Sequence, residues 1–212
     1  MRKTIVLATR NQGKIVEIRR LLAGGPEVLG LDSFPHLEDV EETGATFEEN
    51  ALLKAGYAAR QSGLTALADD SGLEVMALGG APGVRSARFY LEAPTHFCPE
   101  AASKDAMNNA WLLERLKNTP AGQRAARFCS VIAAVHPNGD HISAAGFWSG
   151  QVAFAPLGQN GFGYDPLFLD PELGLTAGQM DLDIKNSRSH RAAALRALAA
   201  LWPAFWARGE KP

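Results

Sequence analysis

Five short polar segments, each lying between an apolar run and a turn, carry the side chains that could bind and cut a nucleoside triphosphate. The segments are Thr9 to Lys14, Glu41 to Gly44, Asp69 to Gly72, Gly161 to Pro166 and Ser189 to Arg191. Together they contain phosphate donors, carboxylates suited to a hard metal ion, aromatic rings on which a base can stack, and cationic side chains. This combination predicts an enzyme that hydrolyses nucleotides.

The first segment has the layout of a phosphate-binding turn. It follows the apolar run Ile5 to Ala8 and precedes apolar residues at helical spacing. A strand that runs into a loop and then a helix presents free backbone N–H groups to anionic oxygens, and Lys14 adds a positive charge. The spacing is not that of a Walker P-loop. Simple helix capping by Asn11, with Lys14 in solvent, therefore remains an alternative interpretation.

Four acidic residues are candidates for a magnesium site, because Mg²⁺ prefers one or two carboxylates together with phosphate oxygens and water. They are Glu41, Glu42, Asp69 and Asp70. We expect a strand over Leu64 to Ala68 that delivers the two aspartates at its end. If the strand persists through both, they face opposite sides, so we expect one to face the metal and the other to cap the turn. A turn without metal is the alternative.

The fourth segment, Gly161 to Pro166, is suited to a purine base. Phe162 or Tyr164 offers a flat ring for stacking, and Asp165 can accept hydrogen bonds from ring N–H groups. A tight loop with core aromatics remains the alternative. Three further donors for a phosphate or a base carbonyl gather around the start of the last helix: Lys185, His190 and Arg191.

The elements that position these segments follow from apolar spacing. Strands are predicted over Ile5 to Ala8, Glu27 to Leu31 and Leu64 to Ala68, and helices over Gly13 to Leu22 and Glu100 to Leu116. A further helix is predicted from the capping box at Thr46 through Ala59.

The second half of the chain changes character. Arg127 to Val135 reads as a strand, and a turn at Pro137 to Asp140 makes it a hairpin whose second arm runs toward Val152. The sequence therefore predicts an α/β fold with a mixed sheet. The last helix begins at Ser189, and Pro203 ends or kinks it. Its predicted inner face consists of Ala194, Leu195, Leu198 and Leu201.

Composition limits the function classes. With 212 residues and 46% hydrophobic residues, the chain can bury a core as one domain or two lobes. A net charge of −2 argues against a protein that binds nucleic-acid backbones. Cys98 and Cys129 lack metal or disulfide spacing and are expected to be reduced core thiols. No run reaches about 20 apolar residues, and the N-terminal run is too short for a signal peptide, so no membrane association and a cytoplasmic location are expected.

Several motifs resemble those of the inosine triphosphate pyrophosphatase family, also called the HAM1 or RdgB-like non-standard purine NTP pyrophosphatases. The resemblance runs in order from about Val6 to Leu198. The motifs are Thr9-x-Asn11-x-x-Lys14, the block from Glu41 to Ala55, Ala68 to Leu73, Gly79 to Gly83, Ser86 to Phe89, Gly161 to Pro166 and Ser189-His190-Arg191.

This resemblance implies an elongated mixed central sheet flanked by helices, in one domain over residues 1–212 with two lobes and a nucleotide cleft between them. It also implies a homodimer that hydrolyses ITP, dITP and XTP to the monophosphate and pyrophosphate with Mg²⁺, which would remove deaminated purines from the nucleotide pool.

The resemblance also assigns roles to residues. Glu41 and Asp70 would bind the metal, and Asp70 would accept the proton of the attacking water. Donors such as Arg191 would read the 6-oxo group of the base. Substrate would be held by Thr9, Arg10, Asn11, Gln12, Gly13, Lys14, Ser71, Phe162, Gly163, Tyr164, Asp165, Lys185, His190 and Arg191.

The chain departs from the family pattern at two of these places. Arg10 stands where the family most often has Gly, and Asp183-Ile184 precedes Lys185 where an acidic residue directly before the lysine is usual. Three other functions are alternatives: a non-catalytic nucleotide sensor, a pyrophosphatase for modified pyrimidine triphosphates, and a nucleic-acid-binding module. The sensor would not need two carboxylates, and the nucleic-acid module would need more basic residues.

Overall fold

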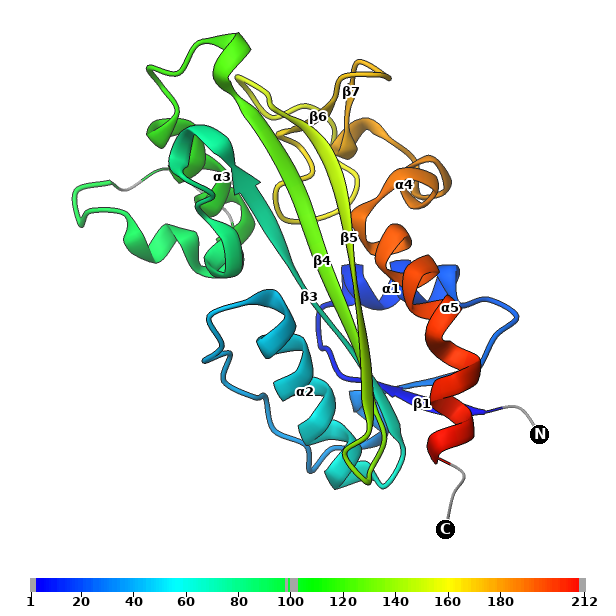
Figure 1. Ribbon diagram of the computed structural model, residues 1–212. Coiled ribbons are helices and arrows are strands. Elements are labelled where there is room, and N and C mark those ends of the chain that lie inside the picture. Colours follow the sequence, from blue (N-terminus) through cyan, green and yellow to red (C-terminus); the bar gives the residue numbers. More distant parts are fainter. Residues whose placement is uncertain (1–2, 98, 100–102, 210–212) are drawn as a thin grey trace. The chain divides into compact units, whose positions relative to one another are not determined.

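The computed structural model describes residues 3–97, 99 and 103–209, and its central element is a sheet of mixed strand direction (Figure 1). In the described part of the chain the sheet has seven strands in the order β2-β1-β3-β4-β5-β6-β7. They are β1 (Thr4–Leu7), β2 (Glu27–Gly30), β3 (Thr65–Val75), β4 (Ala125–Val135), β5 (His141–Val152), β6 (Phe168–Asp170) and β7 (Leu175–Thr176).

Five α-helices accompany the strands over the described residues. They are α1 (Gln12–Leu21), α2 (Phe47–Ser62), α3 (Lys104–Arg115), α4 (Leu182–Arg188) and α5 (His190–Gly209). Short 3-10 helices span Leu31–Ser33, Met76–Leu78, Gly83–Glu92, Ala121–Gln123 and Ala177–Gln179. Strand β1 is parallel to β2 and β3, whereas β6 is antiparallel to β5 and β7. The predicted mixed α/β sheet is therefore confirmed.

The chain divides into two compact units, each with its own core. Unit 1 comprises Met1–Asp70, Ser130–Phe147 and Ser189–Pro212. In this unit α1 and α5 pack on one side of the strands, and Figure 1 shows α2 on the other side. The buried cluster under α1 and α5 includes Ile5, Leu7, Ile15, Ile18, Leu67, Ile132, Ala194, Leu195, Leu198 and Phe205.

Unit 2 comprises Ser71–Cys129 and Trp148–Arg188. Its core is rich in aromatic rings, and the Phe128 and Phe168 rings lie 4.4 Å apart. Helix α3 packs against the Gly83–Glu92 segment, where the Asn108 side chain accepts a hydrogen bond from the Tyr90 backbone at 2.8 Å. The predicted cleft between two lobes, the elongated shape and the single-domain organisation stay predictions.

Several predicted elements are confirmed in detail. Thr46 and Glu49 form the capping box of α2. The β4–β5 turn lies at the predicted residues, where the His136 N–H donates to the Asp140 carbonyl at 2.8 Å. The Ser189 hydroxyl oxygen accepts the Ala192 N–H at 3.2 Å and so caps α5. Cys129 is a buried free thiol, whereas Cys98 lies outside the described residues.

Other predictions need correction. Strand β3 does not end before Asp69 but continues to Val75, and most of this stretch is buried on both faces, as is typical of a strand inside a sheet. Leu201 is 44% exposed rather than part of the inner face of α5. Helix α5 runs through Pro203 to Gly209, so Pro203 does not end it.

The predicted start of the helix over Glu100 to Leu116 includes residues 100–102, which lie outside the described part. No helix among the described residues has the length and apolarity needed to cross a membrane.

Candidate active site

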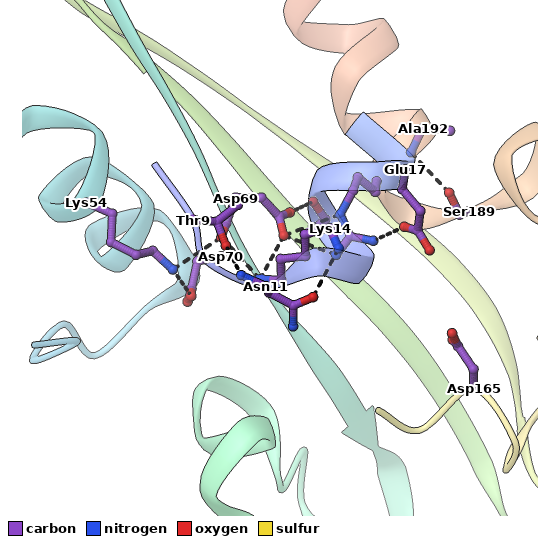
Figure 2. Close-up of polar contacts among 12 residues, drawn as sticks. Thr9, Asn11, Lys14, Glu17, Lys54, Asp69, Asp70, Asp165, Ser189 and Ala192 are labelled. Atoms are coloured by element: carbon purple, nitrogen blue, oxygen red, sulfur yellow. Dashed lines mark hydrogen bonds and ion pairs between the residues drawn. The ribbon is translucent and has the colours of Figure 1, made fainter. Parts of the chain in front are cut away.

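The candidate site in unit 1 is built around Asp69 and Asp70, which are adjacent residues inside β3. Because successive strand side chains alternate, the two carboxylates contact different partners (Figure 2). Asp69 contacts Lys14 of α1, and Asp70 contacts Lys54 of α2. The alternative in which these residues form a simple turn is therefore wrong, and so is the expectation that one of them caps a turn.

Asp70 lies in a cluster with Glu42, Asn50 and Lys54. The Lys54 ammonium is 2.6 Å from Asp70 Oδ1 and 2.8 Å from Glu42 Oε1, so it bridges the two carboxylates. The Asn50 amide reaches Asp70 Oδ2 at 3.4 Å. Asn50 and Lys54 stand one helical turn apart on α2 and therefore share the helix face that meets β3.

The structure brings Glu42, and not Glu41, to Asp70. Glu41 is exposed, whereas Glu42 is half-buried and bonded to Lys54. The capping box orients the start of α2, and the Asn50 side chain accepts the Gly44 N–H at 2.8 Å, which holds the acidic loop against the helix. An added Cβ at Gly44 would lie 2.7 Å from the Asn50 and Glu49 side chains, so this close approach requires glycine.

Burial and neighbouring charges shift the pKa values in this cluster. Burial raises the pKa of Asp70, and Glu42 adds to this effect, whereas Lys54 and Lys14 oppose it; the net pKa is raised. Burial also acts to raise the pKa of Glu42, but the charge and hydrogen bond of Lys54, together with Asp70 and Lys14, outweigh it and the net pKa is lowered. Burial disfavours the Lys54 ammonium, yet the Asp70 and Glu42 carboxylates raise its pKa overall.

Asp69 lies in a second cluster and is fully buried. Its Oδ2 atom is 2.8 Å from the Lys14 ammonium and 3.0 Å from Arg191 Nη2, and its Oδ1 atom accepts the Ser130 hydroxyl at 2.5 Å. Burial acts to raise the pKa of Asp69, but the charges of Arg191 and Lys14 hold it well below its usual range. Arg191 also pairs with Glu17 of α1.

The Arg191 side chain is buried against the Asp69 and Glu17 carboxylates, whereas its predicted role requires contact with the 6-oxo group of the base. Its side chain is 1% exposed, and all three guanidinium nitrogens donate to Asp69 or Glu17. The predicted contact of Arg191 with the 6-oxo group stays a prediction. His190, at the start of α5, is 4% exposed.

The predicted phosphate-binding segment lies at the N-terminus of α1. Asn11 caps the helix by accepting the Lys14 N–H at 3.0 Å, and the Thr9 hydroxyl oxygen accepts the Asn11 N–H at 3.2 Å. Gln12 and Gly13 form the first helical turn. The capping interpretation is thus confirmed, but solvation of Lys14 is not, because its ammonium contacts Asp69.

The Arg10 side chain is directed toward the acidic loop. Its Nη2 atom donates to the Leu37 carbonyl at 2.6 Å, and its Nε atom donates to Asp39 at 2.9 Å. In this structure Arg10 thus ties the segment after β1 to the segment before α2.

Unit 2 holds the predicted base-binding residues. The Lys185 ammonium is 2.5 Å from Asp165 Oδ2 and 4.9 Å from the centre of the Phe162 ring. The same carboxylate oxygen accepts the Phe162 N–H at 2.8 Å. Asp165 and Lys185 are buried, whereas the Phe162 ring is half-buried. The structure thus joins an aromatic face, a carboxylate and a cation in one cluster.

Gly163 and Tyr164 differ from Phe162 in their contacts. The Gly163 N–H donates to Asp105 at 2.8 Å, and its carbonyl accepts the Asn109 amide at 2.9 Å. Tyr164 is 4% exposed, and its hydroxyl donates to the Ser86 carbonyl at 2.9 Å. Burial raises the pKa of Tyr164. Of the two rings considered for stacking, Tyr164 is part of the core.

Ser71, a predicted substrate-binding residue, follows Asp70 on β3 and is half-buried.

The predicted site residues do not include Lys54, Asn50 or Glu17. The sequence does contain a signal for Asn50 and Lys54. They are polar residues four positions apart in the Ala-rich segment that forms α2, so they share one face of that helix. Glu17 stands three residues after Lys14 and so shares its helix face, but nothing in the sequence shows that this face is buried.

Comparison with known proteins agrees with the fold and with the motifs. The chain is 56% identical over 204 residues to a dITP/XTP pyrophosphatase of Nitratidesulfovibrio vulgaris, covering 96% of this chain and 97% of that protein. It is 50% identical over 198 residues to a dITP/XTP pyrophosphatase of Xylella fastidiosa, covering 92% and 95%.

A solved structure of a HAM1 protein from Coxiella burnetii superposes with a TM-score of 0.81 at 40% identity, covering 95% of this chain and 99% of that one. Residues 5–201 match the profile of the Ham1 family. A profile match over nearly the whole chain, together with relatives of this identity and a shared fold, shows that the chain belongs to the Ham1 family.

Proposed function

We propose that this protein is a nucleoside triphosphate pyrophosphatase that hydrolyses the non-standard purine nucleotides ITP, dITP and XTP to the monophosphate and pyrophosphate. The observation that carries the proposal is the cluster at Asp70, where a buried carboxylate with a raised pKa lies beside Glu42 and two lysines. The names of the relatives at 56% and 50% identity support the substrate class.

In the proposed reaction water attacks the α-phosphorus, and the bond to the oxygen of the departing pyrophosphate breaks. The Asp70 carboxylate accepts the proton of the water. The Asn50 amide and the Lys54 ammonium contact this carboxylate and hold it in place for the proton transfer. Lys14, at the N-terminus of α1, stabilises the negative charge of the phosphates together with the backbone N–H groups there.

We further propose that Asp70 and Glu42 hold Mg²⁺. The fit rests on the Lys54 ammonium, which shows that the two carboxylates converge on one cation. Two carboxylates are the protein ligands that Mg²⁺ typically takes when phosphates and water complete its shell. Bound Mg²⁺ would supply charge neutralisation of the triphosphate. Glu41 was the predicted second ligand, and Glu42 is the better candidate because of its position beside Asp70.

The cluster in unit 2 is proposed to bind the base. Phe162 offers the stacking face, and Asp165 with Lys185 offers an acceptor and a donor for polar groups of the purine. Homodimer formation is part of the proposal through the family resemblance, and a cytoplasmic location is part of it as predicted from the sequence. Sedimentation velocity tests the first, because a monomer at working concentration would contradict it.

The function is tested by incubating the protein with ITP, XTP, GTP, ATP and UTP in Mg²⁺ and resolving all phosphate products. We expect monophosphate and pyrophosphate, formed far faster from ITP and XTP than from the others. Diphosphate and orthophosphate would contradict the cleavage position, and preference for UTP would contradict the purine assignment. Asp70→Asn should lose turnover while nucleotide binding persists; unchanged turnover would overturn the role of Asp70.

A further inference from the structure

Four charged side chains next to the proposed phosphate-binding segment are linked in the order Lys14, Asp69, Arg191, Glu17, and the α1 backbone closes this series into a ring. The ring consists of Lys14, Glu17, Asp69 and Arg191, all in unit 1. Three of these side chains are at most 3% exposed, and Lys14 is 14% exposed. Lys14 is therefore the member that solvent or a ligand can reach.

The ring is joined through α1, β3 and α5. Lys14 and Glu17 lie on one face of α1, with their charged groups directed to different partners (Figure 2). Lys14 contacts Asp69 Oδ2 at 2.8 Å, Arg191 Nη2 contacts the same oxygen at 3.0 Å, and Arg191 Nη1 donates to Glu17. Glu17 is thus linked to Lys14 both through the helix and through Arg191 and Asp69.

The ring is neutral only when Glu17 carries its charge, because two cations are then balanced by two carboxylates. Without the charge of Glu17, Asp69 alone would balance both Lys14 and Arg191 within the ring. Arg191 is the more deeply buried cation, and a buried charge that loses its partner carries a large penalty. Arg191 and Lys14 already share Asp69 Oδ2, and Arg191 would then draw more strongly on that oxygen at the expense of Lys14.

The ring also meets the Asp70 cluster at one backbone atom. The Asp69 carbonyl oxygen accepts hydrogen bonds from the Lys14 and Lys54 ammonium groups, each at 3.2 Å. A displacement of Asp69 would therefore move Lys14 and Lys54 together.

We infer that Glu17 is a positioning residue that acts through Arg191 and Asp69 to hold the Lys14 ammonium where it meets the phosphates of the substrate. This inference rests on the proposed function, which assigns the phosphates to the N-terminus of α1. Glu17 itself touches no reacting atom in this assignment, and it differs from Asp70 and Glu42 in having no part in the proposed metal site.

The first test compares Glu17→Gln with wild type in steady-state hydrolysis of ITP. Glutamine keeps the shape of the side chain and removes its charge. We expect kcat/KM to fall about 10- to 100-fold, as for a misplaced positioning group, and Glu17→Asp, which restores the charge, to recover part of the loss.

The matched control is Asp170→Asn, which removes another buried carboxylate that contacts an arginine, Arg188, in unit 2. It should lower the melting temperature and reduce kcat/KM much less than Glu17→Gln does, because Asp170 lies outside the ring. An equal loss of kcat/KM in Asp170→Asn and Glu17→Gln would reduce Glu17 to a general stability role and overturn the inference.

A double-mutant cycle with Lys14→Met separates positioning from stability. If Glu17 acts through Lys14, Glu17→Gln should change kcat/KM less than about 2-fold in the Lys14→Met background. Full additivity of the two losses would overturn the inference. If Glu17→Gln does not fold, Glu17→Asp takes its place in the cycle, because it also displaces the carboxylate.

Binding of inorganic tripolyphosphate, measured by calorimetry, keeps the test separate from the proposed function. If the wild type hydrolyses no nucleotide, the proposed function fails, and the binding experiment still decides the inference. Weaker tripolyphosphate binding in Glu17→Gln, with no further weakening in the Lys14→Met background, supports positioning of Lys14. Equal binding in wild type and Glu17→Gln overturns it.

Discussion

Asp69 and Asp70 have opposite pKa shifts although the two residues are adjacent and both are buried. Asp69 faces Arg191 and Lys14, and its pKa is held well below the usual range. Burial raises the pKa of Asp70 and the like charge of Glu42 adds to this effect, which the opposing charges of Lys54 and Lys14 do not cancel. A carboxylate that stays ionised suits a structural anchor, whereas one with a raised pKa suits proton transfer.

The two glutamates of the acidic loop should differ in their effect on turnover. Glu42→Gln removes a carboxylate that contacts Lys54 beside Asp70, so it should lower kcat with ITP by at least about 100-fold and weaken the dependence on Mg²⁺. Glu41→Gln should have a much smaller effect, because Glu41 is exposed. Titration of activity with Mg²⁺ measures both. If kcat fell more in Glu41→Gln than in Glu42→Gln, Glu41 rather than Glu42 would be the metal ligand.

Substitutions of the two rings considered for base stacking should differ in their effects on KM and on stability. Phe162→Ala should raise KM for ITP about 10-fold, since stacking of a base on an aromatic side chain contributes roughly 1 to 3 kcal/mol. Tyr164→Phe should leave KM unchanged and lower stability by about 1 kcal/mol, because it removes the hydrogen bond to the Ser86 carbonyl. Steady-state kinetics and thermal unfolding distinguish these effects. An unchanged KM in Phe162→Ala would exclude stacking on this ring.

At the scale of elements, the packing of α5 against β5 determines where the Arg191 side chain begins. The two elements meet at Gly146, whose lack of a side chain permits close contact. A Cβ atom there would lie 2.2 Å from the His190 carbonyl oxygen and 2.3 Å from the Ala194 N atom. Because both neighbours are backbone atoms, the first turn of α5 would have to move.

Gly146→Ala should therefore destabilise the protein by about 1 to 3 kcal/mol or more and lower kcat/KM, because the displaced α5 carries Arg191 with it. Denaturant unfolding and ITP kinetics measure the two effects. The matched control is Gly122→Ala in a 3-10 helix, where an added Cβ meets nothing within 4 Å. That substitution should be close to neutral. Equal behaviour of the two variants would show that α5 adapts to the added methyl group.

At the scale of the whole molecule, each unit has its own buried core and its own polar anchors. In unit 2 the Asp170 carboxylate joins β5, β6 and α4, because it accepts Trp148 Nε1 at 3.0 Å and Arg188 Nε at 2.7 Å. Burial acts to raise the pKa of Asp170, but the hydrogen bonds from Trp148 and Arg188 lower it overall. The ionised form of this carboxylate is therefore coupled to folding.

The sign of that coupling gives a pH dependence of stability. Because the folded-state pKa is lowered, the stabilisation is present above the unfolded pKa of about 3.9 and is lost as the pH falls through the folded value. Asp170→Asn should be less stable than wild type at pH 7 by about 1 to 3 kcal/mol. The difference should shrink below about pH 4. Urea unfolding between pH 3 and 7 measures it, and a constant difference would show that the charge of Asp170 is not involved.

Much of the fold was predictable because its signals are local. The capping box at Thr46, the turn at Pro137 to Asp140 and the cap at Ser189 each depend on residues within four positions of one another. The predicted end of β3, at Ala68, was wrong because aspartate residues such as Asp69 and Asp70 are uncommon in strands. Their burial against charged partners outweighs that preference.

The sequence by itself determined the polar segments, their order, the mixed α/β fold and membership of the Ham1 family, since these depend on residue type and spacing. Only the tertiary structure decided that Glu42 and not Glu41 reaches Asp70, and that Arg191 pairs with Asp69 and Glu17. Arg191 is 122 and 174 positions from these partners. No local preference encodes contacts at such separations, because they arise when β3, α1 and α5 pack together.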